Sequence, residues 1–432
     1  MTTSIGTDTA VAVFGYGIEG RSALAWLRRL GCRRVRVLSE VRPDELDDGI
    51  AWIAQSDIDA ALSGVDLVIK SPGIKPSQPL LLAARERGVR TTSATALFVE
   101  RARAAGLAVI GVTGSKGKST TATLIARTLE AASVPTVLVG NIGRAALDVL
   151  EDVVSNRPVI VVELSSYQTH DLTVGPSVAV ITRLFPEHLD WHGGVEPYYA
   201  AKLKIAVTQR EDDVTIWNAA DPELARRAPF GPARHVPYGL GPAGFSDARM
   251  LLRGPHNRLN ARAALYAAEI FGAVPSHLEG VLASFPGLPH RLEDLGVFGG
   301  VRWINDSIAT APEAAVAALD AFADEVQTYI GGGTDRGFDF APLARALVSR
   351  GLPHVILLPP GGPCLLAAIT DLDPAAGARA HVASDLAEAV TLAARLAPRG
   401  STVLFSPASP SYGVYKNFEE RGDRFRGFVQ TL

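Results

Sequence analysis

The run Gly111-Val-Thr-Gly-Ser-Lys-Gly-Lys-Ser-Thr120 has the residue types and the spacing to grip a chain of phosphates. It follows the apolar run Leu107 to Val112 and leads into Thr121 to Leu129, which predicts the order strand, glycine turn, helix. The general phosphate-loop pattern has a glycine where Val112 stands, so the run is a variant of that motif. An ordinary glycine turn between a strand and a helix is the alternative interpretation.

Each residue type in this run has a chemical use. Gly114 and Gly117 let backbone N–H groups curl around an anion, to which the helix N-terminus adds the positive end of its dipole. Lys118 can reach the β- and γ-phosphate oxygens, and Ser119 can offer its hydroxyl to magnesium. We therefore predict a nucleoside triphosphate site at Gly114, Ser115, Lys116, Gly117, Lys118, Ser119 and Thr120.

Three further polar residues follow apolar runs or stand in a helical stretch. Glu163 ends the strand-like run 159–163, where a carboxylate can face a bound triphosphate and hold magnesium. His188 lies just beyond the predicted strand Val178 to Ile181. Lys202 stands in a predicted helix, where a lysine is ordinarily a surface residue. A buried structural glutamate and a structural histidine are the alternatives for the first two.

A second glycine motif, Gly15-x-Gly17-x-x-Gly20, follows a predicted strand and opens a helix, with Glu40 about twenty residues further on. This pattern fits a dinucleotide fingerprint and favours NAD when taken alone. The glycines demand only a tight turn near some phosphate-bearing ligand, and a nucleotide-sugar diphosphate meets the same demand. Ser71-Pro-Gly73-Ile74 ends another strand and indicates a second loop facing that ligand, or a plain turn.

Composition narrows the class of protein. The 432 residues are 47% hydrophobic and 20% charged, and the formal charge is −3, so a polyanion such as nucleic acid is not the expected partner. Cys32 and Cys364 are the only cysteines, which excludes a disulfide framework. The sequence shows neither an apolar signal segment nor a run long enough to cross a membrane. We expect a monomer in the cytoplasm, without a membrane partner.

Strand-like runs alternate with helical stretches along the whole chain, which predicts an α/β fold with parallel sheets. We predict three domains: a Rossmann-like domain at 1–105, a central P-loop domain at 106–287 and a second Rossmann-like domain at 288–432. Phe285-Pro-Gly-Leu-Pro289 interrupts the last helical pattern of the central domain and is the predicted hinge. Further strands are predicted at 35–38, 67–69, 137–139, 214–218, 302–305, 328–330, 354–358 and 402–406.

With these motifs in order, the chain resembles the Mur ligase family, which builds the peptide stem of bacterial cell-wall precursors, and within it the glutamate-adding MurD-type enzymes. The resemblance covers nearly the whole chain. Its carriers are Thr113–Thr120, Gly140–Gly143, Glu163–Gln168, Glu187–Asp190, Ala200–Leu203, Gly254–Asn257, Leu288–Arg291, Trp303–Ser307, Gly331–Gly333 and Lys416–Gly422.

The resemblance implies roles for particular residues. It implies that ATP is held by the phosphate loop with Asn257, Asn260, Arg291 and Asp306, and that the magnesium ligands are Ser119, Glu163, His188 and a carbamylated Lys202. Lys118, His188, Lys202 and Arg291 are the implied catalytic residues. The implied contacts to the acceptor and to glutamate are Gly15, Gly17, Gly20, Ser71, Gly73, Asn141, Ser165, Thr310, Arg336, Ser411 and Phe418.

The implied reaction is ATP-dependent ligation. ATP phosphorylates the alanine carboxylate of UDP-N-acetylmuramoyl-L-alanine, and the amine of glutamate attacks the acyl phosphate, with two magnesium ions as the expected number. The first domain is expected to bind the UDP portion, and closure of the third domain is expected to exclude water.

Two segments depart from the usual MurD pattern. Ile308 follows Asn305-Asp-Ser307, where a lysine is usual, and Ser409-Pro-Ser-Tyr-Gly-Val-Tyr415 replaces the usual cysteine, alanine and serine. Mirror-image glutamates require a different arrangement of cations and hydroxyls. We therefore favour the branch of the family that adds L-glutamate over the D-glutamate enzyme.

Other classes of protein explain less of the sequence. An NAD-dependent oxidoreductase leaves the phosphate loop, Glu163, His188 and Arg291 without a role. A catalytically dead scaffold is expected to have lost at least one of Lys118, Glu163, His188 and Lys202, and all four are present. Other ligases of the same family, including folate polyglutamylation enzymes, stay open, although the first glycine motif favours a UDP-linked acceptor.

Overall fold

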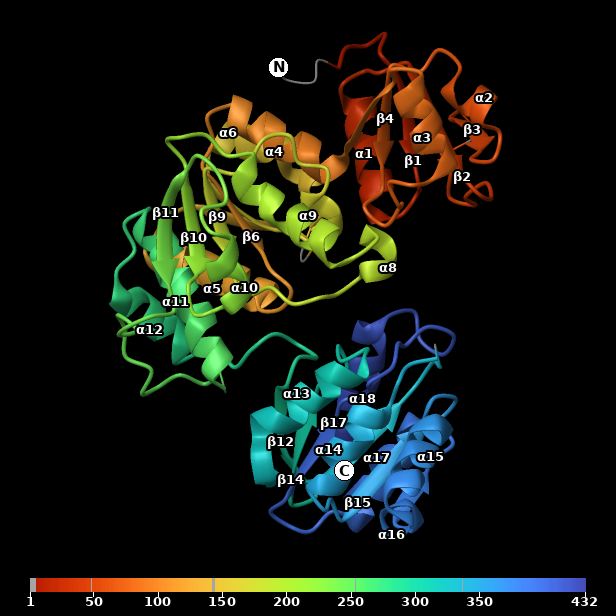
Figure 1. Ribbon diagram of the computed structural model, residues 1–432, viewed down its shortest axis with the longest axis vertical. Helices are drawn as coiled ribbons and strands as arrows, with labels where there is room; N and C mark the ends of the chain where they lie inside the picture. Colours follow the sequence, from red (N-terminus) through yellow and green to blue (C-terminus); the bar gives the residue numbers. More distant parts are fainter. Residues whose placement is uncertain (1–4, 48, 142–143, 253, 336) are drawn as a thin grey trace. The chain divides into compact units, whose positions relative to one another are not determined.

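The computed structural model describes residues 5–47, 49–141, 144–252, 254–335 and 337–432 (Figure 1). The chain forms two compact units, one of residues 1–250 with 255–284 and one of residues 251–254 with 285–432. The first unit contains two sheets and the second contains one, each with helices between its strands. The predicted three-domain α/β fold is confirmed, while the boundaries at 105/106 and 287/288 stay predictions.

The first sheet is parallel throughout, with the strand order β3-β2-β1-β4-β5. Since β1 lies between β2 and β4, the loops that follow β1 and β4 flank the point where the strand order reverses, which is where open α/β sheets bind ligands. The elements are β1 (Ala10–Phe14), α1 (Ile18–Arg29), β2 (Arg34–Ser39), β3 (Ala51–Ala54), α2 (Ile58–Leu62), β4 (Leu67–Lys70), α3 (Pro79–Glu86), β5 (Arg90–Ser93) and α4 (Ala94–Ala104).

The central sheet is also parallel, with the order β11-β10-β9-β6-β8-β7. Its elements are β6 (Val109–Thr113), α5 (Lys118–Ala131), β7 (Thr136–Gly140), η1 (Ala146–Val149), α6 (Leu150–Asn156), β8 (Val159–Glu163), α7 (Ser166–Thr169), β9 (Val178–Ile181), α8 (Leu189–His192), α9 (Val195–Val207), β10 (Val214–Asn218), α10 (Pro222–Arg227), β11 (Arg234–Tyr238), α11 (Pro255–Glu269) and α12 (Pro275–Leu282).

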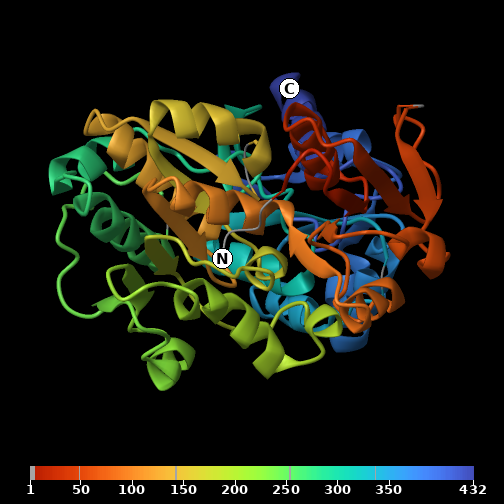
Figure 2. The same cartoon turned by 90° about the horizontal axis from the view of Figure 1, so that it is seen from above.

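Burial explains why the middle strands of the central sheet form here. Every residue of β6, β8 and β9 is buried, as expected for strands covered on both faces by crossover helices. Helices α5 and α11 contact each other and both pack on this sheet, so they cover the same face (Figures 1 and 2). The carboxyl ends of β6, β8 and β9 therefore lie side by side at one edge of the sheet.

The third sheet has the order β12-β13-β17-β14-β15-β16, with β12 antiparallel to β13 and the other pairs parallel. Its elements are β12 (Glu293–Phe298), β13 (Val301–Asn305), α13 (Pro312–Phe322), η2 (Ala323–Glu325), β14 (Val326–Gly332), α14 (Ala341–Ser349), β15 (His354–Leu358), α15 (Gly362–Leu372), α16 (Pro374–Ala378), β16 (Ala380–Val382), α17 (Leu386–Leu396), β17 (Thr402–Phe405) and α18 (Phe418–Gln430).

One hydrophobic core joins the first and central sheets. Val11 of β1 and Leu27 of α1 belong to the same buried cluster as Leu147, Ile160 and Ile205. The third sheet has separate clusters on its two faces, around Leu343 and around Phe425. Within the described part of the chain, no helix is both long and apolar enough to cross a membrane.

Candidate functional site

The phosphate loop connects β6 to α5 as the sequence predicts. Gly117 is the N-cap of α5 with φ of 90°, and Gly114 has φ of 146°. A Cβ atom at Gly114 would lie 2.1 Å from Thr182 Oγ1, so backbone conformation and close packing both require glycine there. The turn therefore brings the loop backbone directly against the segment that follows β9.

Lys118 begins α5 and folds back over the loop. Its Nζ donates to the carbonyl oxygens of Gly114 at 3.0 Å and Ser115 at 2.9 Å. Ser119 and Thr120 follow in the first turn and are buried. The cation and the helix N-terminus are thus held on the same side of the loop, as anion binding requires.

Side chains of the loop and its neighbours fix its shape. Ser115 Oγ donates to the Phe185 carbonyl at 2.7 Å and lies 2.9 Å from Tyr198 Oη, while Thr182 Oγ1 donates to the Lys116 carbonyl at 2.7 Å. Lys116 Nζ pairs with Glu187 at 2.9 Å, although its side chain is exposed. The Ser115 N–H also donates to the Arg183 carbonyl at 2.6 Å, so Ser115 and Thr182 fix the loop against the segment that follows β9.

Glu163 lies at the carboxyl end of β8 and is completely buried. Its Oε1 accepts a hydrogen bond from Asn141 Nδ2 at 3.1 Å, and its Oε2 is buried with no hydrogen-bond partner in the described residues. A buried carboxylate oxygen without a donor is costly unless a cation completes it. Glu163 and Asn141 thus meet at the same edge as the phosphate loop, where the sequence predicts them.

Lys202 lies on α9 and is 2% exposed, unlike an ordinary helical lysine. Its Nζ donates to the Gly114 carbonyl at 2.7 Å and lies 4.9 Å from the centroid of the Tyr198 ring. Burial, reinforced by the nearby charge of Lys118, holds the pKa of Lys202 well below its usual value. The sequence-predicted lysine therefore reaches the phosphate loop.

His188 has φ of 53° and is the N-cap of α8. Its ring centroid lies 5.1 Å from that of Tyr167, which follows Glu163 on the segment leading through α7. Loss of solvent around the ring, together with the charges of Lys202 and Lys118, lowers the pKa of His188. A neutral imidazole near neutral pH is the form that can bind a metal ion.

His192, one turn further on, gives a prediction about stability. Its Nε2 lies 3.0 Å from Ser166 Oγ, and burial lowers its pKa from 6.5 to about 4. Between these two pH values the unfolded chain binds a proton that the folded chain does not, so stability falls as the pH falls. We expect the urea midpoint to drop between about pH 7 and about pH 5, and His192→Gln to reduce that drop.

This measurement is made without nucleotide or magnesium, so that ligand binding does not contribute. An unchanged pH dependence in the variant contradicts the assignment to His192.

The residues that resemblance places near adenine lie on α11. Asn260 Nδ2 donates to Asn257 Oδ1 at 3.0 Å, and both residues are buried. A Cβ atom at Gly117 would lie 2.5 Å from Asn260 Oδ1, so this asparagine packs against the phosphate loop. The structure thus brings Asn257 and Asn260 to the loop at the start of α5.

In the first sheet, the two predicted loops touch. A Cβ at Gly15 would lie 2.7 Å from Ser71 Oγ, which donates to the Gly15 carbonyl at 3.2 Å, and a Cβ at Gly20 would lie 2.0 Å from that same carbonyl oxygen. Gly17 and Gly73 are exposed, and an added Cβ would meet no atom within 4 Å. The strand order places this pair of loops at the reversal point of the sheet.

In the second unit, the loops after β13, β14 and β17 are bound together. Buried Arg421 donates to the carbonyls of Ser307 at 2.7 Å and Ser409 at 2.9 Å, and Thr334 N donates to the Pro410 carbonyl at 3.1 Å. Ser307 Oγ also donates to the carbonyl of Phe418 at 2.8 Å. The loops after β13 and β17 carry the predicted residues Thr310 and Ser411, and the predicted residue Phe418 begins α18. Arg336 lies outside the described residues.

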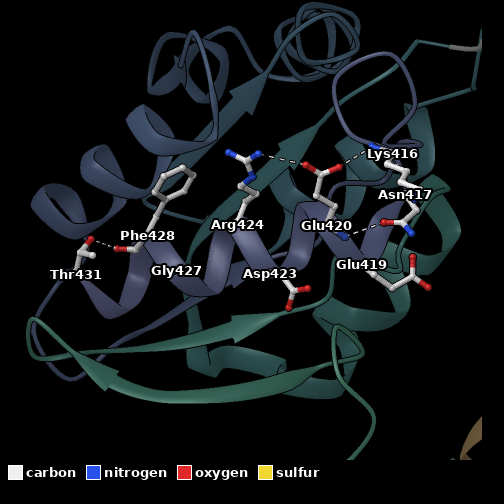
Figure 3. Close-up of a pocket in the computed structure, with 9 residues that line it drawn as sticks. All are labelled: Lys416, Asn417, Glu419, Glu420, Asp423, Arg424, Gly427, Phe428 and Thr431. Carbon is white, nitrogen blue, oxygen red and sulfur yellow. Dashed lines mark hydrogen bonds and ion pairs between the residues drawn. The ribbon is translucent and has the colours of Figure 1, made fainter.

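Asp306 and Arg291 lie near the start of this unit. Asp306 is buried and accepts hydrogen bonds from Leu292 N at 3.1 Å and Ser406 Oγ at 2.8 Å. Arg291 Nε is buried and has no hydrogen-bond partner within the ranges that the structure describes. A separate hollow runs along α18 and is lined by charged residues including Lys416, Glu420 and Arg424 (Figure 3). None of the residues predicted to contact ATP, magnesium or the substrates lines this hollow.

The site fits magnesium in its donor types. Ser119 and Glu163 offer oxygen, His188 offers nitrogen, and the unpartnered Glu163 Oε2 is the observation that favours a cation. In the described part of the chain, no cluster of three or more histidine, cysteine, aspartate or glutamate side chains forms a complete metal site. Any metal here therefore needs further ligands, which phosphate oxygens can supply.

Sequence reasoning missed residues that brace the site. Tyr198 contacts Ser115 and Lys202, and Lys70 and Asp171 form a buried pair at the end of β4. A lysine ending the apolar strand Leu67-Val-Ile-Lys70 was the available signal, because a charge at the end of a buried strand requires a partner.

Comparisons with known proteins identify the family of this chain. The chain matches the Mur ligase middle domain over residues 112–246 and the Mur ligase, glutamate ligase domain over residues 290–409. It is 38% identical to the UDP-N-acetylmuramoyl-L-alanine–L-glutamate ligase of Xanthomonas euvesicatoria pv. vesicatoria (strain 85-10), over 96% of this chain and 94% of that protein.

A relative with a different name is almost as similar. The chain is 36% identical, over 98% of both proteins, to the UDP-N-acetylmuramoylalanine–D-glutamate ligase of Symbiobacterium thermophilum (strain DSM 24528 / JCM 14929 / IAM 14863 / T). The fold of the present chain is similar to that of MurF from Acinetobacter baumannii, with a TM-score of 0.62 and 19% identity over 100% of this chain and 93% of the MurF chain. The chain belongs to the Mur ligase family.

Proposed function

We propose that this protein is an ATP-dependent ligase that adds glutamate to UDP-N-acetylmuramoyl-L-alanine in peptidoglycan precursor synthesis. The observation that carries the proposal is the identity of 38%, along nearly the whole chain, to a relative with that named activity. The site supports it because a phosphate loop, a buried carboxylate and a buried lysine converge on Gly114 and its neighbours.

ATP is the proposed triphosphate, held by the loop from Gly114 to Thr120. The N-terminus of α5 and the Nζ of Lys118 supply positive charge to the phosphates. Asn257 and Asn260 are buried beside the loop and offer amide groups to the nucleotide. Arg291 and Asp306 are proposed as further ATP contacts, as the family resemblance implies.

Magnesium is the proposed metal, with two ions as in the family resemblance. Ser119, Glu163 and His188 are proposed as ligands. When bound, magnesium neutralises the charge that builds up on transferring phosphoryl oxygens. Two features of the protein favour metal binding. Glu163 Oε2 accepts no hydrogen bond from the described residues, and the lowered pKa of His188 favours the neutral imidazole.

Lys202 is proposed to carry a carbamate. A buried lysine with a lowered pKa has a free amine lone pair, which attacks carbon dioxide to form an N–C bond and releases one proton. The product is an anion in place of a cation, which removes the repulsion between Lys202 and magnesium. The Gly114 carbonyl, 2.7 Å from Nζ, accepts the remaining N–H of the carbamate.

The proposed reaction proceeds through an acyl phosphate of the acceptor. A carboxylate is a poor electrophile, so the acceptor acid takes the terminal phosphoryl group of ATP and phosphate becomes the leaving group. Lys118 and Arg291 are proposed to stabilise negative charge during that transfer and during attack by the glutamate amine. The loops at Gly15 and Ser71 are proposed to hold the UDP portion, with Asn141 and Ser165 toward the muramoyl part.

L-glutamate is the proposed amino acid. Ile308 lies beside Ser307, in the loop that Arg421 holds against Ser409, so an apolar side chain stands where the MurD pattern has a cation. The Xanthomonas relative carries the L-glutamate name. D-glutamate is the second candidate, since the Symbiobacterium relative carries that name at 36% identity.

The test measures phosphate release from ATP by the purified protein. We expect release only when UDP-N-acetylmuramoyl-L-alanine and L-glutamate are both present, with turnover at least about tenfold faster with L- than with D-glutamate, a difference of about 1.4 kcal/mol in transition-state binding. Faster turnover with D-glutamate assigns the second candidate. No release with either isomer overturns the proposed function.

A further inference from the structure

Glu19 links the first glycine loop to the central sheet. It lies in the first turn of α1, two residues after Gly17, and its two carboxylate oxygens accept hydrogen bonds from Gln168 Nε2 at 2.7 Å and Thr95 Oγ1 at 3.1 Å. Burial raises the pKa of Glu19, although these two hydrogen bonds oppose the rise. The carboxylate is therefore committed to one fixed set of partners.

Gln168 holds both ends of this contact. Its Oε1 accepts from Ser165 N at 2.9 Å, and Ser165 Oγ accepts from Gln168 N at 3.3 Å, which forms a capping box on α7. Its Nε2 is then left to donate to Glu19 and, at 3.2 Å, to Thr95. One amide group thus fixes the start of α7 and contacts α1.

A second contact lies at the other glycine loop. Lys70, immediately before Ser71, pairs with Asp171 at 2.6 Å, and the two side chains are 3% and 8% exposed. Burial alone would raise the pKa of Asp171, but His170 and Lys70 together hold it below its usual value. Both charges are thus paired where solvent does not reach them.

These contacts converge on one short segment. Glu163 ends β8, and Ser165, Gln168 and Asp171 lie in the segment that follows. Both loops of the first sheet are therefore tied to the peptide that begins with the buried carboxylate. Hydrogen bonds within buried networks fix geometry because an unmade bond leaves a costly unsatisfied group.

We propose that Glu19 and Gln168 are positioning residues that set the placement of the acceptor nucleotide relative to Glu163 and Ser165. This inference rests on the proposed function. The Lys70–Asp171 pair provides the second fixed point, so that the 163–171 segment cannot pivot about the first. Neither Glu19 nor Gln168 needs to touch the reacting atoms for this role.

The role predicts a selective kinetic defect. For Glu19→Ala we expect kcat/KM for UDP-N-acetylmuramoyl-L-alanine to fall about 100-fold, since small misplacements of a substrate have effects of this size. We expect the KM for ATP to change less than about threefold, because the phosphate loop makes no contact with Glu19 in the hydrogen bonds of the described residues.

Four further variants sharpen the test. Gln168→Ala removes the same contact from the other side, and the double variant is expected to be no worse than the worse single one. Glu19→Gln keeps an oxygen for Gln168 and is expected to restore activity to within about fivefold. Arg29→Ala breaks the exposed Arg29–Glu151 ion pair between α1 and α6, together with the Arg29 hydrogen bond to the Leu147 carbonyl. It serves as the matched control, with near wild-type kinetics expected.

The outcomes separate the inference from the proposed function. Absence of ligation by the wild-type protein overturns both. Wild-type ligation together with a Glu19→Ala variant that behaves like Arg29→Ala overturns the inference alone. A loss that affects ATP and the acceptor equally and follows a lowered thermal midpoint shows a structural role and also overturns it. Gln168→Ala keeps the test valid if Glu19→Ala does not fold.

Discussion

Lys118→Ala is expected to lower the rate of ATP-dependent ligation by about 10²- to 10³-fold, since removing one preorganised donor at a site of developing charge has effects of this order. In the structure, Lys118 Nζ is held by the carbonyls of Gly114 and Ser115, directly over the turn. Alanine keeps the helix and removes the cation that the phosphates require. Single-turnover phosphoryl transfer measures the effect at the step where it acts.

The matched control is Arg127→Ala, which removes an exposed cation from the same helix. We expect it to retain wild-type turnover, because Arg127 lies outside the phosphate loop. A Lys118→Ala protein that folds normally and keeps more than about a tenth of the activity contradicts the role assigned to Lys118.

Lys202→Met is expected to lower turnover by about 10³-fold, because the variant keeps the apolar stem and loses the group proposed to become an anion beside magnesium. In the wild-type protein, ¹³C-labelled bicarbonate is expected to give a carbamate signal that is absent from the variant. The signal should increase with pH, since carbamate formation uses the neutral amine and releases a proton. Because burial lowers the pKa of Lys202, labelling is expected at a lower pH than for an exposed lysine.

Lys204→Met is the matched control on α9. Lys204 Nζ also donates to a carbonyl, that of His170, at 2.7 Å, and burial also lowers its pKa. We expect this variant to keep the labelled signal and most of the activity. Full activity of Lys202→Met in carbonate-free buffer contradicts the proposed carbamate.

The buried strands could be predicted from the sequence because each is a short, continuous apolar run, which is typical of a strand covered on both faces. β8 (Val159–Glu163), β9 and β10 have the predicted bounds, and β15 does as well. β3, β5, β11, β12 and β16 were not predicted. These are edge or near-edge strands whose residues are mostly half-buried or exposed, so they lack a continuous apolar run.

The residues of the candidate site also differ in how far the sequence predicts them. The phosphate loop and Glu163 could be predicted, because glycine spacing and a carboxylate at a strand end are local signals. The burial of Lys202 could not, since it results from packing of α9 around Tyr198 and Ile205, which periodicity alone does not reveal. The Glu19–Gln168 contact joins residues 149 positions apart and leaves no local pattern at all.

The three glycines of the first motif answer to different constraints. A side chain at Gly15 or Gly20 would collide with the protein's own atoms, whatever molecule is bound, whereas one at Gly17 would point into open space. Two thirds of this signature therefore reports how a strand turns into a helix. The same motif can therefore occur in proteins that share this strand-to-helix turn but bind different ligands. Of the three glycines, only Gly17 is not required by the packing of the protein itself.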